Sequence, residues 1–182
     1  MRLRDIPNLL CILRMFLAAP VAWMILEGNY DVALALFFVA GFTDGLDGFL
    51  AKRFHWQTEL GGMLDPIADK LLIFSAFVCL WVVGLVPLWL LLVVVGRDVM
   101  IVSGAVAYRV LVGPFEASPT LISKLNSAVQ LLFVLLALTY LALGQPPRPL
   151  LTGLALIILL TTVISGTDYV INWARRARVI GR

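Results

Sequence analysis

Charged residues are scarce in this chain of 182 residues: they make up 14% of it, while 62% of the residues are hydrophobic. A soluble domain typically carries about 25% charged and about 45–50% apolar residues. The apolar residues here form runs that are long enough to cross a bilayer, at about 20 residues per span. The composition therefore argues against a soluble domain and predicts an all-α polytopic membrane protein, with one membrane domain over residues 1–182.

Cysteine and histidine are also rare, with two cysteines and one histidine in the whole chain. Cys11 and Cys79 lie inside apolar runs, where cysteine usually acts as a small buried hydrophobe, so we expect no disulfide framework. His55 has no second histidine with which it could share a metal ion. The absence of a Cys/His cluster argues against a structural zinc site.

Six apolar segments are separated by short stretches of turn-forming residues. The first segment lacks a small-residue cleavage site followed by a soluble region, so we expect it to be a permanent helix and not a signal peptide. The predicted transmembrane helices cover residues 8–26, 32–50, 60–83, 86–110, 121–143 and 150–173.

The basic residues gather at one set of helix ends, which the positive-inside rule places in the cytoplasm. With six spans, both termini then lie on the cytoplasmic side of a bacterial-type inner membrane or an equivalent organelle membrane. Membrane spans separate the basic residues, so they form no nucleic-acid-binding patch. The basic set is Arg2, Arg4, Lys52, Arg53, Arg109, Lys124, Arg175, Arg176, Arg178 and Arg182, against Arg148 with Glu27 and Asp31 at the opposite ends.

Four aspartates lie within 26 residues at the ends of two consecutive predicted helices: Asp44, Asp47, Asp65 and Asp69. The first two are three residues apart and the last two are four apart, so each pair shares one helix face. The short basic connection between the helices folds them back on each other. Both pairs can then face a common polar pocket near the cytoplasmic surface.

This clustering of carboxylates predicts a metal site. A carboxylate inside the bilayer costs about 2.5–3.5 kcal/mol even on the translocon scale, and four together also repel one another. Divalent ions would offset that charge, and oxygen ligands suit Mg²⁺ or Mn²⁺, with room for two ions. The alternative is helix capping at the interface, for which Asp65-Pro66 is the best candidate.

Small residues accompany the acidic ones. Gly48 follows Asp47, and Gly61 precedes Asp65 by four residues. Glycine at these places would let a phosphate or a planar group approach the backbone closely. The alternative for each glycine is close packing between helices.

Together these residues resemble the signature of the CDP-alcohol phosphotransferase family. The resemblance consists of Asp44-x-x-Asp47-Gly48-x-x-Ala51-Lys52, then eight residues, then Gly61-x-x-x-Asp65-x-x-x-Asp69, with every spacing in agreement. One position departs, because the family usually has Arg where this chain has Lys52. That exchange keeps the charge and loses the bidentate fork.

The resemblance implies roles for these residues. Asp44, Asp47 and Asp65 would hold metal ions that bridge the diphosphate of a CDP-activated lipid, with Asp69 completing the metal site and acting as the general base on the acceptor hydroxyl. The CDP group would be lined by Gly48, Ala51, Lys52 and Gly61. The implied reaction is transfer of a phosphatidyl group from CDP-diacylglycerol to an alcohol with release of CMP.

The acceptor is indicated by segments 96–100 and 119–130, which resemble the eukaryotic-type cardiolipin synthases of the family more than the bacterial phosphatidylglycerophosphate synthases. This implies phosphatidylglycerol as the acceptor and cardiolipin as the product. Arg97 and Lys124 would bind the acceptor phosphate, with Arg14 as a further candidate. Their alternatives are snorkelling to the interface or, for Arg97, pairing with Asp98.

Three other interpretations stay open. The first is a sister enzyme that uses glycerol 3-phosphate as acceptor. The second is a membrane prenyltransferase, which would need a second aspartate motif that this sequence lacks. The third is a cation transporter with intramembrane carboxylates, although these aspartates lie at one end of the spans and in the first half only. The family also suggests a homodimer, surrounded by membrane lipids.

Overall fold

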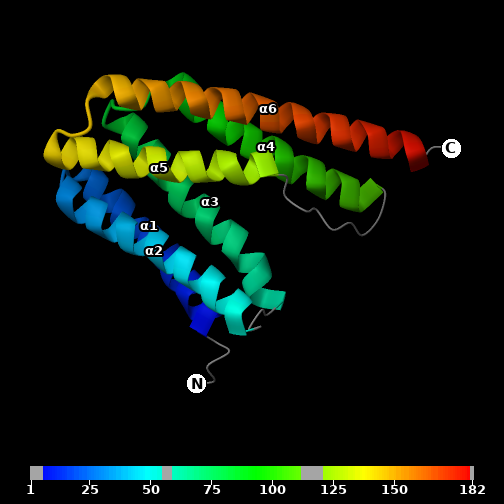
Figure 1. The fold of residues 1–182 in the computed structure, drawn as a ribbon, viewed down its shortest axis with the longest axis horizontal. Coiled ribbons are helices and arrows are strands. Elements are labelled where there is room, and N and C mark those ends of the chain that lie inside the picture. Colours follow the sequence, from blue (N-terminus) through cyan, green and yellow to red (C-terminus); the bar gives the residue numbers. More distant parts are fainter. Residues whose placement is uncertain (1–5, 55–58, 112–120, 181–182) are drawn as a thin grey trace. The chain divides into compact units, whose positions relative to one another are not determined.

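The computed structural model describes residues 6–54, 59–111 and 121–180, and those described residues contain six helices and no strand. Within them, residues 6–10, 44–54, 59–67, 105–111, 168 and 170–180 are described as helical backbone only. The helices are α1 (Ile6–Leu26), α2 (Tyr30–Phe54), α3 (Glu59–Val82), α4 (Leu88–Leu111), α5 (Leu121–Leu143) and α6 (Arg148–Ile180) (Figure 1).

The all-helical class and the six predicted helices are confirmed, and the bounds of α5 agree with the prediction at both ends. The largest difference is at α6, which continues to Ile180, seven residues past the predicted end. Hydropathy marks where a helix leaves the apolar layer, whereas arginine and alanine are good helix formers and extend the helix beyond it. The same reason explains why α2 continues through Lys52 and Arg53 to Phe54.

Two helical stretches of the described residues are both long and apolar enough to cross a bilayer, Leu121–Leu143 and Arg148–Thr167. Two further apolar stretches, Cys11–Leu26 and Tyr30–Thr43, are shorter. Charged residues in the remaining helices interrupt their apolar runs.

Glycine ends α1 and α3 in the same way. Gly28 and Gly84 each have φ of +79°, in the left-handed region that glycine enters without a steric penalty. After α1, the Asn29 N–H donates to the Met24 carbonyl at 2.9 Å; after α3, the Leu85 N–H donates to the Leu80 carbonyl at 3.0 Å. These bonds satisfy carbonyls that a helix end leaves open, so both helices stop sharply.

The chain forms two compact units, and the first comprises Met1–Val86 with Leu131–Leu151. In this unit α1 packs against both α2 and α3 (Figure 1). Its core is apolar: the ring of Phe77 stacks on that of Phe133, with centroids 5.6 Å apart. Other buried apolar residues of this unit include Val21, Ile25 and Phe37. Arg14 is the one charged side chain buried among the described residues of this unit.

The second unit comprises Pro87–Gln130 with Thr152–Arg182, and its interior has a different chemistry. Apolar residues such as Leu90, Val94 and Ile158 are buried in it. A set of polar side chains is buried as well: Arg97, Ser123, Asn126, Gln130, Thr162 and Ser165. Burying such groups in membrane helices is energetically unfavourable unless they bond to one another or to a ligand. This unit is therefore a place to look for function.

Candidate active site

The four aspartates of the predicted metal site lie inside helices and not at their ends. Asp44 and Asp47 lie well within α2, and α3 begins at Glu59, before Asp65 and Asp69. Helix capping uses the residue just before a helix, so it does not account for these positions, including Asp65-Pro66. The side chains of Asp44, Asp47 and Asp65 lie outside the described residues, and their role as metal ligands stays a prediction.

The predicted CDP-binding residues also lie within α2 and α3, in parts of these helices where only the backbone is described. Gly48, Ala51 and Lys52 belong to α2, and Gly61 belongs to the first turn of α3. Their helical backbone agrees with the spacing argument, because residues three and four apart on a helix recur on one face. Their side chains lie outside the described residues, as do His55 and the chain on either side of it. The contacts predicted for them with CDP therefore stay predictions.

Asp69 is the member of the acidic set whose side chain is described, and it is paired with an arginine. Arg14 Nη1, from α1, donates to Asp69 Oδ1, from α3, so two helices that pack together meet at this ion pair. The Arg14 side chain is 1% exposed, whereas that of Asp69 is 42% exposed. A buried cation thus holds a carboxylate that is partly exposed. The structure places Arg14, a further candidate for the acceptor phosphate, on the predicted base, and its contact with the acceptor stays a prediction.

The chemistry of the donor set fits a hard divalent cation. The four predicted ligands are carboxylates, and oxygen-only donors suit Mg²⁺ or Mn²⁺. Among the side chains that the structure describes, no group of three or more His, Cys, Asp or Glu could hold a metal ion. The described residues thus contain no competing metal site, and Asp69 is the one predicted ligand that they include.

Arg97 lies at the meeting point of three helices in the second unit. Its guanidinium donates to Asp98 Oδ1 at 2.7 Å on α4, to Ser123 Oγ at 2.6 Å on α5 and to Ser165 Oγ at 2.8 Å on α6. Its side chain is 4% exposed. The pairing with Asp98 that the sequence left as an alternative is therefore present. Arg97 ties the three helices together and has two of its guanidinium nitrogens engaged.

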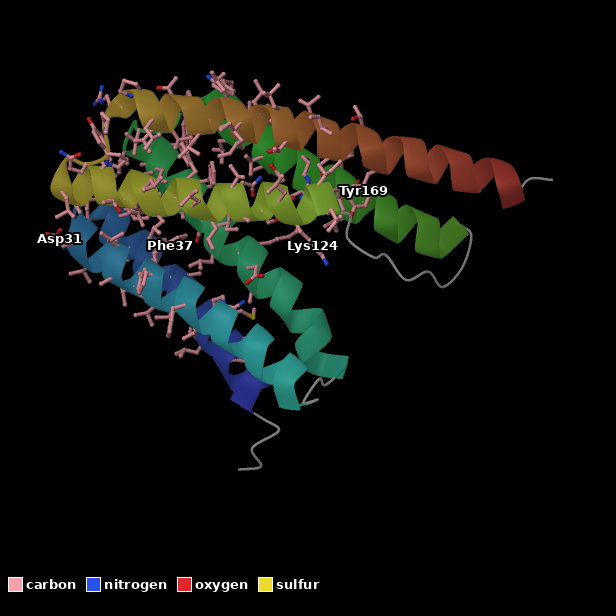
Figure 2. All side chains as sticks on the ribbon, viewed as in Figure 1. Asp31, Phe37, Lys124 and Tyr169 are labelled. Carbon is pink, nitrogen blue, oxygen red and sulfur yellow. The ribbon has the colours of Figure 1, made fainter. Side chains whose placement is uncertain are left out.

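Lys124 behaves differently from its neighbour Ser123. Ser123 is buried against Arg97, whereas Lys124 is exposed, and its side chain extends from α5 on the side away from α6 (Figure 2). The structure therefore does not bring the two predicted acceptor-binding cations together. Binding of the acceptor phosphate by Lys124 stays a prediction.

The sequence interpretation missed a second group of polar residues on α5 and α6. Asn126 Oδ1 accepts a hydrogen bond from Thr162 Oγ1 at 3.0 Å and lies 2.8 Å from Thr161 Oγ1. Gln130 is one turn further along α5 and is 2% exposed. A signal was present: in the apolar α5, polar residues recur at 123, 126 and 130, a spacing of three and four that places them on one face.

Comparison with known proteins decides the family. A sequence model of the CDP-alcohol phosphatidyltransferase family matches residues 4–173. The chain belongs to this family. The family resemblance carried by the aspartate and glycine spacing is thus confirmed. The predicted extent of the domain, residues 1–182, is not tested by this match.

Relatives of the chain include proteins of two named activities. A "probable cardiolipin synthase (CMP-forming)" of Drosophila melanogaster is 35% identical over 96% of this chain and 59% of its own length. The human "cardiolipin synthase (CMP-forming)" is 39% identical over 71% of this chain and 48% of its own length. A "probable phosphatidylglycerophosphate synthase" of Mycobacterium tuberculosis is 35% identical over 99% of this chain and 85% of its own length.

The lengths of these matches differ between the two groups. The chain spans 48% to 59% of the two cardiolipin synthases and 85% of the mycobacterial protein. The family is shared by all three, and the acceptor alcohol is what separates their printed names. The acceptor of this chain is therefore the question that remains for a proposal.

Proposed function

We propose that this chain transfers a phosphatidyl group from CDP-diacylglycerol to phosphatidylglycerol, giving cardiolipin and CMP. The acceptor hydroxyl would lose its proton to Asp69 and attack the lipid-side phosphorus of the diphosphate. A new P–O bond forms to the acceptor, the bond to CMP breaks, and CMP leaves with the electron pair. The observation that carries this proposal is the Arg14–Asp69 pair, in which a buried guanidinium orients a half-exposed carboxylate at the last position of the family signature.

The metal requirement is part of the same proposal. Asp44, Asp47, Asp65 and Asp69 would hold Mg²⁺ or Mn²⁺, with two ions expected, and bound metal would neutralise charge on the diphosphate and on the leaving CMP. Arg14 supports this arrangement, because its buried guanidinium holds the partly exposed carboxylate of Asp69 in place. Lys52 and the small residues Gly48, Ala51 and Gly61 would receive the CDP group.

The membrane arrangement is proposed as six passes, with both termini and the polar pocket on the cytoplasmic side. Six helices and the asymmetry of basic residues support it. The location would be a bacterial-type inner membrane or an equivalent organelle membrane. A homodimer is proposed as well, since large apolar side chains such as Phe74, Trp81 and Trp89 are exposed on α3 and α4 and could pack against a second copy.

A second candidate acceptor is glycerol 3-phosphate. It is favoured by the mycobacterial relative, which matches nearly the whole of this chain, and by a Bacillus subtilis relative named as a CDP-diacylglycerol–glycerol-3-phosphate 3-phosphatidyltransferase, 31% identical over 91% of this chain. The chemistry at phosphorus is the same for both acceptors. They differ in charge, because glycerol 3-phosphate carries a phosphate monoester and phosphatidylglycerol a diester.

An acceptor competition tests the proposal directly. The purified chain in detergent micelles would receive CDP-diacylglycerol and Mg²⁺ or Mn²⁺, with phosphatidylglycerol or glycerol 3-phosphate in separate reactions, and CMP release would be followed. We expect release with phosphatidylglycerol, no release after chelation of the divalent ions, and recovery when either ion is restored.

The other outcomes are equally informative. Release only with glycerol 3-phosphate would keep the reaction and replace the acceptor. Undiminished release in the presence of chelator would contradict the metal site. A chain that releases no CMP with either acceptor would contradict the proposed activity.

A further inference from the structure

Polar side chains form three successive levels along α5 inside the second unit. At the first level, Ser123 binds the Arg97 guanidinium together with Ser165 of α6. At the second level, one turn further along α5, Asn126 meets Thr161 and Thr162 of α6. Gln130 forms the third level. The side chains at 97, 126 and 130 each belong to residues that are at least nine-tenths buried.

The contacts of Thr162 determine how the Asn126 amide is oriented. The Thr162 hydroxyl has Asn126 as its acceptor, at 3.0 Å, and the described residues offer it no other. Thr161 can also donate to the carbonyl of Ile157 at 2.8 Å, so it does not depend on Asn126. If the NH₂ group of Asn126 faced Thr162 instead, the hydroxyl proton of Thr162 would have no acceptor. The carbonyl oxygen of Asn126 therefore faces α6, and its NH₂ group faces away from Thr162.

Three buried donors on these three polar levels have no partner among the described residues: Asn126 Nδ2, Gln130 Nε2 and Arg97 Nε. Buried donors in proteins are almost always bonded, and one left open bears the full desolvation penalty of its group. All three are donors, so the group that completes them must carry acceptor oxygens. Asn126 and Gln130 are four residues apart and present their amides on one face of α5.

The charges of these polar side chains indicate which kind of hydrogen-bond acceptor fits beside them. Arg97 already has the carboxylate of Asp98 as its partner, so the two charges balance within the unit. Asn126 and Gln130 are neutral, and the cation nearest in sequence, Lys124, is exposed. A phosphate monoester with two negative charges would meet no uncompensated cation here, and burying it would be unfavourable. A phosphodiester carries one negative charge instead of two, and the hydroxyls of a glycerol headgroup carry none, so neutral donors cost less to complete with this headgroup than with a phosphate monoester.

We propose that the amides of Asn126 and Gln130 bind the headgroup of the acceptor phospholipid, a glycerol phosphodiester, and that their neutrality selects it over a phosphate monoester. This inference rests on the proposed function, since it names the residues that choose the acceptor. Thr162 acts as a positioning residue, because it holds the Asn126 amide with its donors turned away from α6. Arg97 Nε is available as a further donor to the same headgroup.

Gln130→Met is the sharpest test, because methionine nearly matches glutamine in shape and removes the polar group. Deleting an open buried donor should leave thermal stability unchanged or raise it, whatever the role of the residue. If Gln130 binds the headgroup, KM for phosphatidylglycerol should rise about tenfold while KM for CDP-diacylglycerol stays the same. Asn126→Leu should raise the same KM. Gln145→Met, at an exposed turn position, is the matched control and should change neither.

Each outcome decides the inference. Wild-type KM for phosphatidylglycerol in Gln130→Met, with stability kept, would overturn it and leave a water or a packing role for these amides. If Asn126→Leu fails to fold, Gln130→Met decides alone. If the wild-type chain releases no CMP, the proposed function fails. The headgroup site is then tested by direct titration of phosphatidylglycerol into the protein in micelles. A tenfold weaker Kd in Gln130→Met would then support the headgroup site, and an equal Kd or no binding would overturn it.

Discussion

Arg14 and Asp69 show how one side chain can prepare another for chemistry. The guanidinium is buried, and the carboxylate it holds is 42% exposed, so the pair reaches from the protein interior to its surface. The sequence predicted a role for both residues but not their contact, because they are 55 positions apart and lie on different helices. The pattern of aspartates indicated what each residue could do, and only the packing of α1 against α3 shows which residues meet.

Asp69→Asn should reduce CMP release by about 10²- to 10⁴-fold, the range typical for loss of a general base. It should also lower stability by about 1–3 kcal/mol, because Arg14 loses an anionic partner at a buried position. In Arg14→Met/Asp69→Asn the stability loss should be smaller than the sum of the two single losses, while CMP release stays as low as in Asp69→Asn. CMP release and thermal unfolding in detergent measure both effects. Additive stability losses would show that the pair does not interact.

At the level of helices, the sequence predicted more than it did at the level of contacts. Runs of apolar residues and the Gly and Pro residues between them gave six helices, most with ends within two residues of those observed. Hydropathy could not predict where α2 and α6 end, because the helices continue into charged sequence. Nor could it show that Arg97 would bind Ser123 and Ser165, since serine in an apolar helix is compatible with many neighbours.

Close approach between α4 and α6 depends on a residue without a side chain. A Cβ at Gly166 would lie 3.0 Å from the end of Met100, one turn along α4 from Arg97, whereas a Cβ at Gly153 would meet nothing within 4 Å. Gly166→Ala should have little effect, because the flexible end of methionine can move. Gly166→Leu should overpack the contact and destabilise the protein by about 1–3 kcal/mol.

Gly153→Leu is the matched control on the same helix, and it should leave the Tm unchanged or raise it, since leucine has the higher helix propensity. The Tm of the variants in detergent is the measurement. Equal Tm values for Gly166→Leu and Gly153→Leu would mean that α4 and α6 do not approach closely at this position.

For the whole molecule, the main question is the orientation in the membrane. The turns after α1 and α5 carry few basic residues, and the predicted cytoplasmic ends carry many. The positions of the basic residues predict how the chain is oriented in the membrane, because basic residues beside a transmembrane span favour the cytoplasmic side during insertion. Native Cys11 and Cys79 are buried, which makes the chain suitable for labelling at introduced cysteines.

Cysteines introduced at Asn29 and Gln145, both exposed in turns, should react with a membrane-impermeant maleimide in intact cells. A cysteine introduced at Lys124, exposed at the start of α5, should react only after permeabilisation. The variants Cys11→Ala and Cys79→Ala control for background labelling. The reverse pattern would place the polar pocket on the outer face, out of reach of a cytosolic nucleotide.

The bonds between Asn126 and the threonines of α6 also bear on how the protein is made. During synthesis α5 leaves the ribosome before α6. If α5 entered the bilayer alone, the side chains of Asn126 and Gln130 would face lipid hydrocarbon. The short turn after α5 brings α6 soon afterwards, and the hydroxyls of Thr161 and Thr162 can then donate to the Asn126 carbonyl oxygen. We therefore expect the last two helices to leave the translocon as a pair, with the carbonyl of Asn126 shielded from its first exposure to the bilayer.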